Sequence, residues 1–164
     1  MAYVDFDFYT TSYHGSVVPE SDFERLSERA SDFLDAITFD RLVDGLPSDE
    51  RAAAKVKKAA CAVSEKLYML ELAEKQAISA AAGGSSVGRS GDVTSGVVTS
   101  KSAGSESISY ASFSETASGA KGWSAVYQAA GDPQKESKLL EDTARLYLSG
   151  VRNDEGDPLL YAGL

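Results

Sequence analysis

Apolar and polar residues alternate with a helical period in three stretches of the chain. In the first, apolar positions recur at spacings of three and four between residues 21 and 36, with charged residues between them. The segment Ser21-Asp22-Phe23-Glu24 matches a capping box, in which a serine hydroxyl and a glutamate carboxylate satisfy free backbone amides. The pattern therefore predicts an amphipathic helix over residues 21–36.

Two further helices are expected from the same period. Ser48 follows a proline and is the expected N-cap of a helix over residues 48–81, which would be about 50 Å long. Asp132 and Pro133 open a helix over residues 133–149 that Gly150 ends. Between the first two helices, Thr38 is expected to start a short turn that ends at Gly45. The apolar positions expected in the core are Phe23, Leu26, Phe33, Ile37, Val56, Val63, Leu67, Leu70, Leu140 and Tyr147.

The rest of the chain lacks a helical period. Residues 83–104 are rich in Ser, Gly, Thr and Val and are expected to form a long flexible loop. Residues 107–110 alternate weakly, as a short strand or an extended arm does. The aromatic-rich opening before Pro19 is expected to be irregular. These patterns predict an all-α fold, a small helical bundle. The helical domain would span residues 1–150, and an extended C-terminal tail would span residues 151–164.

The tail ends in an apolar run, Leu159-Leu160-Tyr161-Ala162-Gly163-Leu164, after a polar turn. Such a run must bury its side chains against something. Two interpretations remain open at this point: the tail folds back on its own helices, or it binds another chain. We expect the second.

Composition narrows the class of protein. A chain of 164 residues with 43% hydrophobic residues can build a globular core without metals or disulfides. Neither a signal peptide nor a membrane span is expected, and the single cysteine, Cys61, indicates a reducing compartment. The net charge of −9 disfavours tight binding of nucleic acid, although an acidic lining could surround DNA without holding it.

Candidate catalytic motifs are weak. Residues 83–90 match the phosphate-loop pattern except that Arg89 replaces the lysine, and no strand is expected before them. Cys61 and His14 could in principle form a nucleophilic pair, but each is more simply structural. No residues show metal-ligand spacing, and the cluster Lys55, Lys57 and Lys58 suggests a solvated helix face. We therefore expect no enzyme, no cofactor and no metal.

Several short segments, in order along the chain, resemble the head–tail connector (adaptor) family of tailed bacteriophages. They are Tyr9, Tyr13-His14-Gly15, Pro19, Phe23-Glu24-Arg25-Leu26, Ala30, Ile37-Thr38, Arg41-Leu42, Ala60-Cys61, Glu65, Ser105-Glu106-Ser107-Ile108-Ser109-Tyr110, the run 144–150 and the final Leu160-Tyr161-Ala162-Gly163-Leu164. The similarity covers most of the chain, while residues 83–104 contribute nothing to it.

This resemblance implies a structural virion protein at the neck of the particle, assembled in the host cytoplasm. Copies of the chain would form a ring, a dodecamer in the virion, beneath the portal protein. The ring would extend the channel for passing double-stranded DNA and receive a head-closure or neck/tail protein on its other face. In this family the C-terminal tail attaches to the portal, which here implies Pro158, Leu159, Leu160, Tyr161 and Leu164. The alternative is a cytoplasmic helical interaction or regulatory protein whose tail is a binding peptide.

Overall fold

The computed structural model describes residues 2–81, 97–102, 107–111 and 121–160. Its elements are α1 (Phe6–Thr11), α2 (Glu20–Ile37), α3 (Glu50–Ala81), β1 (Val97–Ser102), β2 (Ser107–Ala111), α5 (Lys121–Ala129) and α6 (Pro133–Leu148). The chain divides into two compact units: Met1–Met69 with Ser137–Leu164, and Leu70–Glu136. The described part is mainly helical, as the sequence patterns predict.

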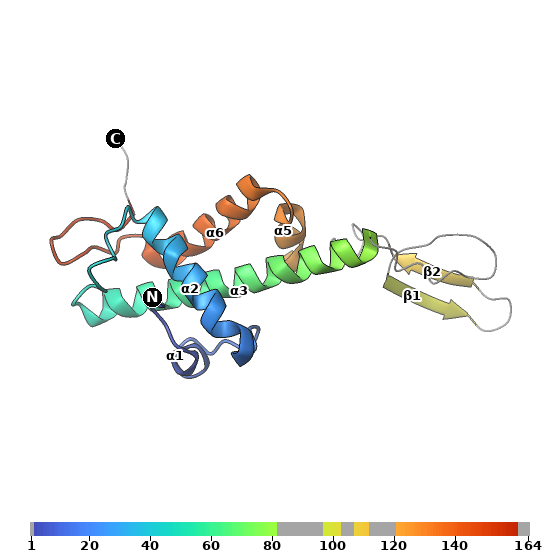
Figure 1. Ribbon diagram of the computed structural model, residues 1–164, viewed down its shortest axis with the longest axis horizontal. Helices are drawn as coiled ribbons and strands as arrows, with labels where there is room; N and C mark the ends of the chain where they lie inside the picture. Colours follow the sequence, from blue (N-terminus) through green and yellow to red (C-terminus); the bar gives the residue numbers. More distant parts are fainter. Residues whose placement is uncertain (1, 82–96, 103–106, 112–120, 161–164) are drawn as a thin grey trace. The chain divides into compact units, whose positions relative to one another are not determined.

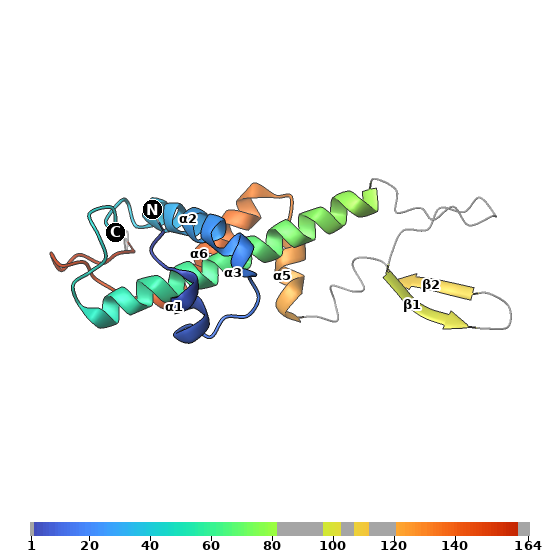
Figure 2. The same cartoon turned by 60° about the horizontal axis from the view of Figure 1, so that its bottom comes forward.

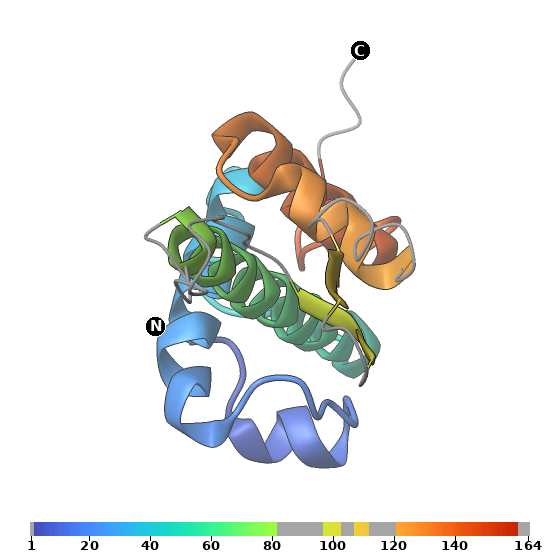
Figure 3. The same cartoon turned by 90° about the vertical axis from the view of Figure 1, so that its right-hand side faces the viewer.

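The first unit is built around the beginning of α3. In Figures 1 and 3, α1 and α6 lie on different sides of this part of α3, and α2 crosses it. Residues 151–160 belong to the same compact unit as α2, and Val151 and Leu159 are buried in it.

The helix starts show how local sequence fixes the boundaries. Asp132 caps α6 as predicted, since its Oδ1 atom accepts hydrogen bonds from the backbone amides of the first turn. The expected capping box at Ser21 is wrong. The helix already begins at Glu20, after the extended Pro19, and no side chain caps it. The N-cap of α3 is Asp49 instead of Ser48, because the Asp49 carboxylate accepts the amide of Ala52 at 2.8 Å.

The helix α1 was not expected from the sequence. It has only six residues, and Asp5 caps it by accepting the amide of Phe8 at 2.8 Å. A helix this short contains fewer than two turns, so no periodic pattern can distinguish it from an irregular segment.

The core of the first unit includes most of the residues expected there. Phe23, Leu26, Val56, Val63, Leu67 and Leu140 are buried, as is Leu70 in the second unit. Phe33, Ile37 and Tyr147 are only half-buried.

The buried face of α2 is therefore rotated relative to the expected one. It passes through Ser27, Ser31 and Leu34, all of which are at most 1% exposed. The two serine hydroxyls bond to backbone carbonyls one turn earlier, which allows them to be buried without unsatisfied polar atoms.

Thr38 ends α2 and does not start the next element. Its hydroxyl donates to the Leu34 carbonyl at 2.8 Å. A turn follows over residues 38–44, and Gly45 ends it with a φ of +134°, a conformation that favours glycine.

The second unit contains the end of α3, a two-stranded hairpin and α5. Its buried side chains include Leu70, Ala73, Val126 and Ala129, and the Tyr127 hydroxyl of α5 donates to Gln76 of α3 at 2.9 Å. Strands β1 and β2 pair antiparallel, with an irregularity between Val98 and Ser100. The expected short strand at 107–110 is present as β2.

The flexible loop expected over 83–104 is wrong for residues 97–102. These residues form β1, since the β-branched Val97-Val98-Thr99 favours extended backbone and β2 supplies the pairing partner. The remaining residues of that range lie outside the described part. No helix in the described ranges is both long and apolar enough to cross a membrane.

Candidate docking surface

The C-terminal segment, residues 151–160, folds back on the first unit as a narrow loop. The Leu159 amide donates to the Val151 carbonyl at 2.9 Å, and Arg152 pairs with Pro158 in a short antiparallel bridge. At the tip, the Asn153 side-chain oxygen accepts the amide of Asp157 at 2.7 Å. These bonds give the segment a defined conformation up to Leu160.

Leu159 corrects part of the expected docking tail. Its side chain is 0% exposed, so it belongs to the core of its own chain and cannot lie on a partner surface in this conformation. Pro158 and Leu160 are half-buried, which leaves part of each accessible. Tyr161 and Leu164 lie outside the described residues. The docking function inferred for the tail can therefore begin only at the residues that flank Leu159.

Two contacts attach this segment to the turn and loop that follow α2. Arg41 donates from Nη1 to the Pro158 carbonyl at 2.5 Å and lies 3.4 Å from that of Leu159. Ser48 donates from both its amide and its hydroxyl to Asp154 Oδ1, each at 2.8 Å. Figures 1 and 2 show the loop 151–160 beside the residues that connect α2 to α3. The C-terminal segment is thus fixed at both its tip and its base.

The turn contacted by Arg41 exposes two large apolar side chains. Phe39 is 64% exposed and Val43 is 63% exposed, whereas Leu42 between them is fully buried. Phe39 and Asp40 have φ angles of +57° and +59°. This left-handed conformation costs roughly 1–2 kcal/mol for each non-glycine residue.

Arg41 connects the exposed turn with the C-terminal segment. Its guanidinium carbon lies 5.8 Å from the centre of the Phe39 ring, while its Nη1 atom holds the Pro158 carbonyl. We use the name docking surface for the accessible parts of Phe39, Val43, Pro158 and Leu160. Sequence reasoning placed Phe39 and Val43 in the turn without assigning them a role. Two apolar residues inside a short polar turn were the available signal.

The aromatic–glycine turn that contributes to the family resemblance is a packing element. Tyr9 is fully buried, accepts the amides of Val17 and Val18 at its hydroxyl and donates to Glu65 Oε1 at 2.9 Å. Gly15 lies against the Tyr9 ring, where an added Cβ would be 2.0 Å from Cε2. No residue larger than glycine fits at this position without displacing the tyrosine.

Glu65 binds a second tyrosine in the same cluster. The Tyr13 ring stacks on that of Tyr9 at 5.8 Å between centres, and its hydroxyl lies 3.3 Å from Glu65 Oε2. Burial, followed by the negative charge of Glu65, raises the pKa of Tyr13 above its usual value. Both tyrosines are therefore uncharged at neutral pH. Their hydrogen bonds to Glu65 connect the N-terminal region around α1 to α3.

The two members of the candidate nucleophilic pair lie in different surroundings. Cys61 is fully buried, and burial, with a smaller effect from the charge of Glu65, raises the pKa of its thiol to about 12. His14 is exposed. The phosphate-loop-like residues 83–90 lie outside the described part, and the described ranges contain no group of three His, Cys, Asp or Glu able to hold a metal.

The comparisons with known proteins leave the family open. The sequence matches no protein-family model, and neither a curated protein nor a solved structure is significantly similar to it.

Proposed function

We propose that this protein is a head–tail connector of a tailed bacteriophage, which forms a ring beneath the portal and extends the DNA channel. The order of the resembling segments along the chain and the mainly helical fold support this proposal. The observation that carries it is the position of the docking surface. Leu159 and Arg41 anchor the C-terminal segment up to Leu160, on the loop that Arg41 joins to the exposed Phe39 turn.

The proposed mechanism is mechanical. Leu160 and the apolar residues after it bury against the portal together with Phe39 and Val43, and each side chain contributes about 1.5–3 kcal/mol if fully buried. A ring of copies multiplies this modest contact, because attachment of one copy raises the effective concentration of its neighbours at the portal. The net charge of −9 suits a channel wall that repels the phosphates of passing DNA.

Binding to purified portal rings tests the proposal. The full chain is compared with a variant that lacks residues 160–164 and with the double variant Phe39→Ser/Val43→Ser. A matched control, Leu146→Ser, changes a side chain of α6 that is 81% exposed and is not part of the docking surface. We expect the control to bind as the wild type does and both test variants to lose binding at least about tenfold, a change of about 1.4 kcal/mol.

Circular dichroism must show that each variant keeps its helical content. Unchanged portal binding by both test variants would refute the docking surface. Cryo-electron microscopy of the encoding phage tests the function itself, because it should show a ring of this protein directly below the portal. Intact necks that lack the protein would instead favour the interaction or regulatory protein considered above.

A further inference from the structure

Three cations form a row on α3. Arg51, Lys55 and Lys58 are spaced by four and three residues, which places them on one face of the helix. Arg51 and Lys55 are exposed and Lys58 is half-buried. Among the described residues, none of the three forms an ion pair or a side-chain hydrogen bond. Lys57 is different, because it lies over the Phe8 ring at 5.4 Å. We call Arg51, Lys55 and Lys58 the basic row.

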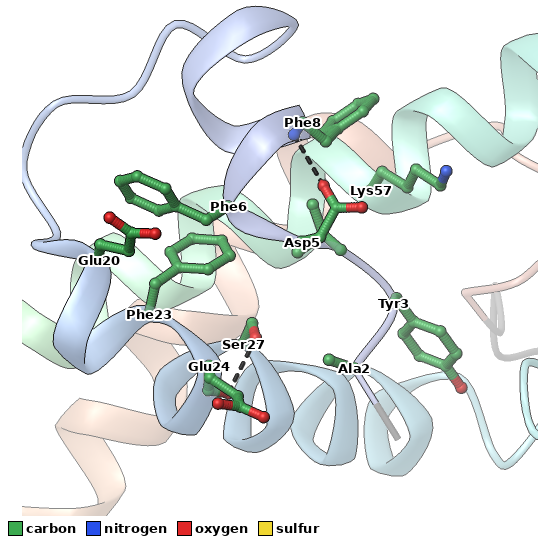
Figure 4. A pocket seen from close by; sticks show the side chains of 11 residues that line it. Ala2, Tyr3, Asp5, Phe6, Phe8, Glu20, Phe23, Glu24, Ser27 and Lys57 are labelled. Atoms are coloured by element: carbon green, nitrogen blue, oxygen red, sulfur yellow. Dashed lines mark hydrogen bonds between the residues drawn. The ribbon is translucent and has the colours of Figure 1, made fainter.

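A pocket of about 470 Å³ lies elsewhere on the same unit, between the N-terminal segment and the first turns of α2. Figure 4 shows Phe6 and Phe23 inside it, with their rings edge to face and 5.5 Å apart. The wall formed by the N-terminal segment is fixed in place. The Tyr3 amide donates to Ser31 Oγ at 2.9 Å, and the Tyr3 hydroxyl donates to Asp35 of α2. The pocket is therefore a defined part of the fold.

Two glutamates of α2 line this pocket, and the one cation in its lining, Lys57, lies over the Phe8 ring. Glu20 and Glu24 are both exposed and lie four residues apart on α2, so they face the same way. In the part of the chain that the structure describes, neither carboxylate takes part in a hydrogen bond or an ion pair. Glu28 continues the series by four more residues and is also exposed. We call Glu20, Glu24 and Glu28 the acidic row.

The two rows match in spacing as well as in charge. Side chains four residues apart on a helix have Cβ atoms about 5–6 Å apart. The Glu20–Glu24 pair on α2 and the Arg51–Lys55 pair on α3 therefore repeat at the same distance. The pocket adds aromatic surface beside the acids, on which the alkyl stem of an arginine or lysine can pack while its charged end pairs with a carboxylate.

We propose that the acidic row and pocket on α2 of one copy bind the basic row on α3 of a second copy. This inference rests on the proposed function, and it identifies the contact between neighbours in the ring. The two surfaces differ, so the contact is head-to-tail, which is the kind that closes into rings. Copies with a net charge of −9 repel one another at long range, and the complementary rows supply an attractive orientation.

Paramagnetic relaxation in mixed samples of the full chain tests the contact without any portal. One copy, without ¹⁵N, carries a spin label at Ala54→Cys. This half-buried position lies beside the basic row, and the substitution leaves all three cations in place. The other copy is labelled with ¹⁵N. We expect the spin label to broaden the amide signals of Phe6, Glu20 and Glu24 in the ¹⁵N-labelled copy.

Charge reversal supplies the specificity control. Glu20→Lys with Glu24→Lys in the ¹⁵N-labelled copy should weaken the association roughly tenfold or more, because like charges then oppose one another. Arg51→Glu with Lys55→Glu in the spin-labelled copy should restore it. The matched control Lys138→Glu reverses an exposed charge on α6 and should leave the broadening unchanged.

Absence of broadening at the pocket amides, or broadening that ignores the reversals, would overturn the proposal. Broadening centred on Phe39 and Val43 would also overturn it, since the second copy would then occupy the docking surface. The outcome is separate from that of the proposed function. A chain that self-associates through these rows but fails to bind portal rings would retain the interface and lose the connector role.

Discussion

Replacing Leu159 with alanine separates an anchoring role for this residue from a docking role. The side chain is 0% exposed within its own chain, and its backbone is held by hydrogen bonds to Val151 and Arg41. Removing a fully buried leucine costs the transfer free energy of the lost atoms and leaves a cavity. We therefore expect Leu159→Ala to lower the free energy of unfolding by about 3 kcal/mol.

The neighbouring residue provides the control. Leu160 is only half-buried, and so Leu160→Ala should lower the free energy of unfolding by less than about 1 kcal/mol. For a chain of this length, the Leu159 variant should melt about 6–12 °C below the wild type. Urea unfolding followed by circular dichroism measures both differences at 25 °C. The slope with urea concentration must be checked, because two units can unfold separately.

Portal binding completes the comparison. Leu159→Ala should bind portal rings normally at temperatures where it remains folded, whereas the loss of residues 160–164 should weaken binding at least about tenfold without unfolding the first unit. The reverse result, a Leu159 variant of wild-type stability that no longer binds portals, would refute the anchoring role. Leu159 would then belong to the portal interface, as the sequence alone suggested.

Three further predictions concern the first unit. Gly15→Ala should destabilise it by at least about 2 kcal/mol in urea unfolding, because the new Cβ would overlap the Tyr9 ring, whereas Gly150→Ala, in open space with a φ of +76°, should cost about 1 kcal/mol. Arg41→Ala should cost about 1–3 kcal/mol by the same measurement and accelerate proteolysis of the C-terminal segment, since two backbone carbonyls lose a charged donor. The Cys61 thiol should resist labelling by a disulfide reagent at pH 8 except through unfolding. Its pKa rises from about 8.5 in the unfolded chain to about 12 in the folded chain. The contribution of the protonated thiol to the free energy of unfolding is therefore complete below pH 8 and is lost as the pH rises towards 12. Rapid labelling of the folded protein, or a Cys61→Ala variant with the same alkaline loss of stability, would contradict this.

The sequence predicts the long helices well because each repeats its apolar face over several turns. The errors are small rotations of the predicted buried face about the helix axis. Phe33 and Ile37 were expected in the core, but α2 is rotated so that Leu34 is buried and two serines join the face. Serine looks polar in a pattern, yet its hydroxyl can bond to the preceding turn and be buried at little cost. A periodicity argument that scores serine as polar therefore misplaces this face.

Elements whose stability comes from distant residues were not predictable. The helix α1 is held by Tyr9 through Glu65, which lies 56 residues later in the chain. Leu159 is buried, and its carbonyl accepts a hydrogen bond from Arg41, which lies 118 residues earlier. The same holds for β1, which needs β2 as a partner before its valines indicate a strand. A local sequence pattern contains no information about such contacts. For this reason α1 was interpreted as irregular, Leu159 as part of a docking tail and β1 as part of a loop.

The position of Leu159 also changes how a docking tail would work. An apolar peptide attached to the unit only by a flexible linker would lose much of its binding free energy to the ordering of that linker. Here the chain is ordered up to Leu160 by the buried leucine, the Arg41 bonds to two carbonyls and the Ser48–Asp154 clamp. A force applied to residues beyond this anchor would pass directly into the helical core. For a connector of the kind proposed, the removal of Leu159 or of Arg41 should therefore lower the resistance of the attachment to force, even where the folded variant still binds portal rings normally.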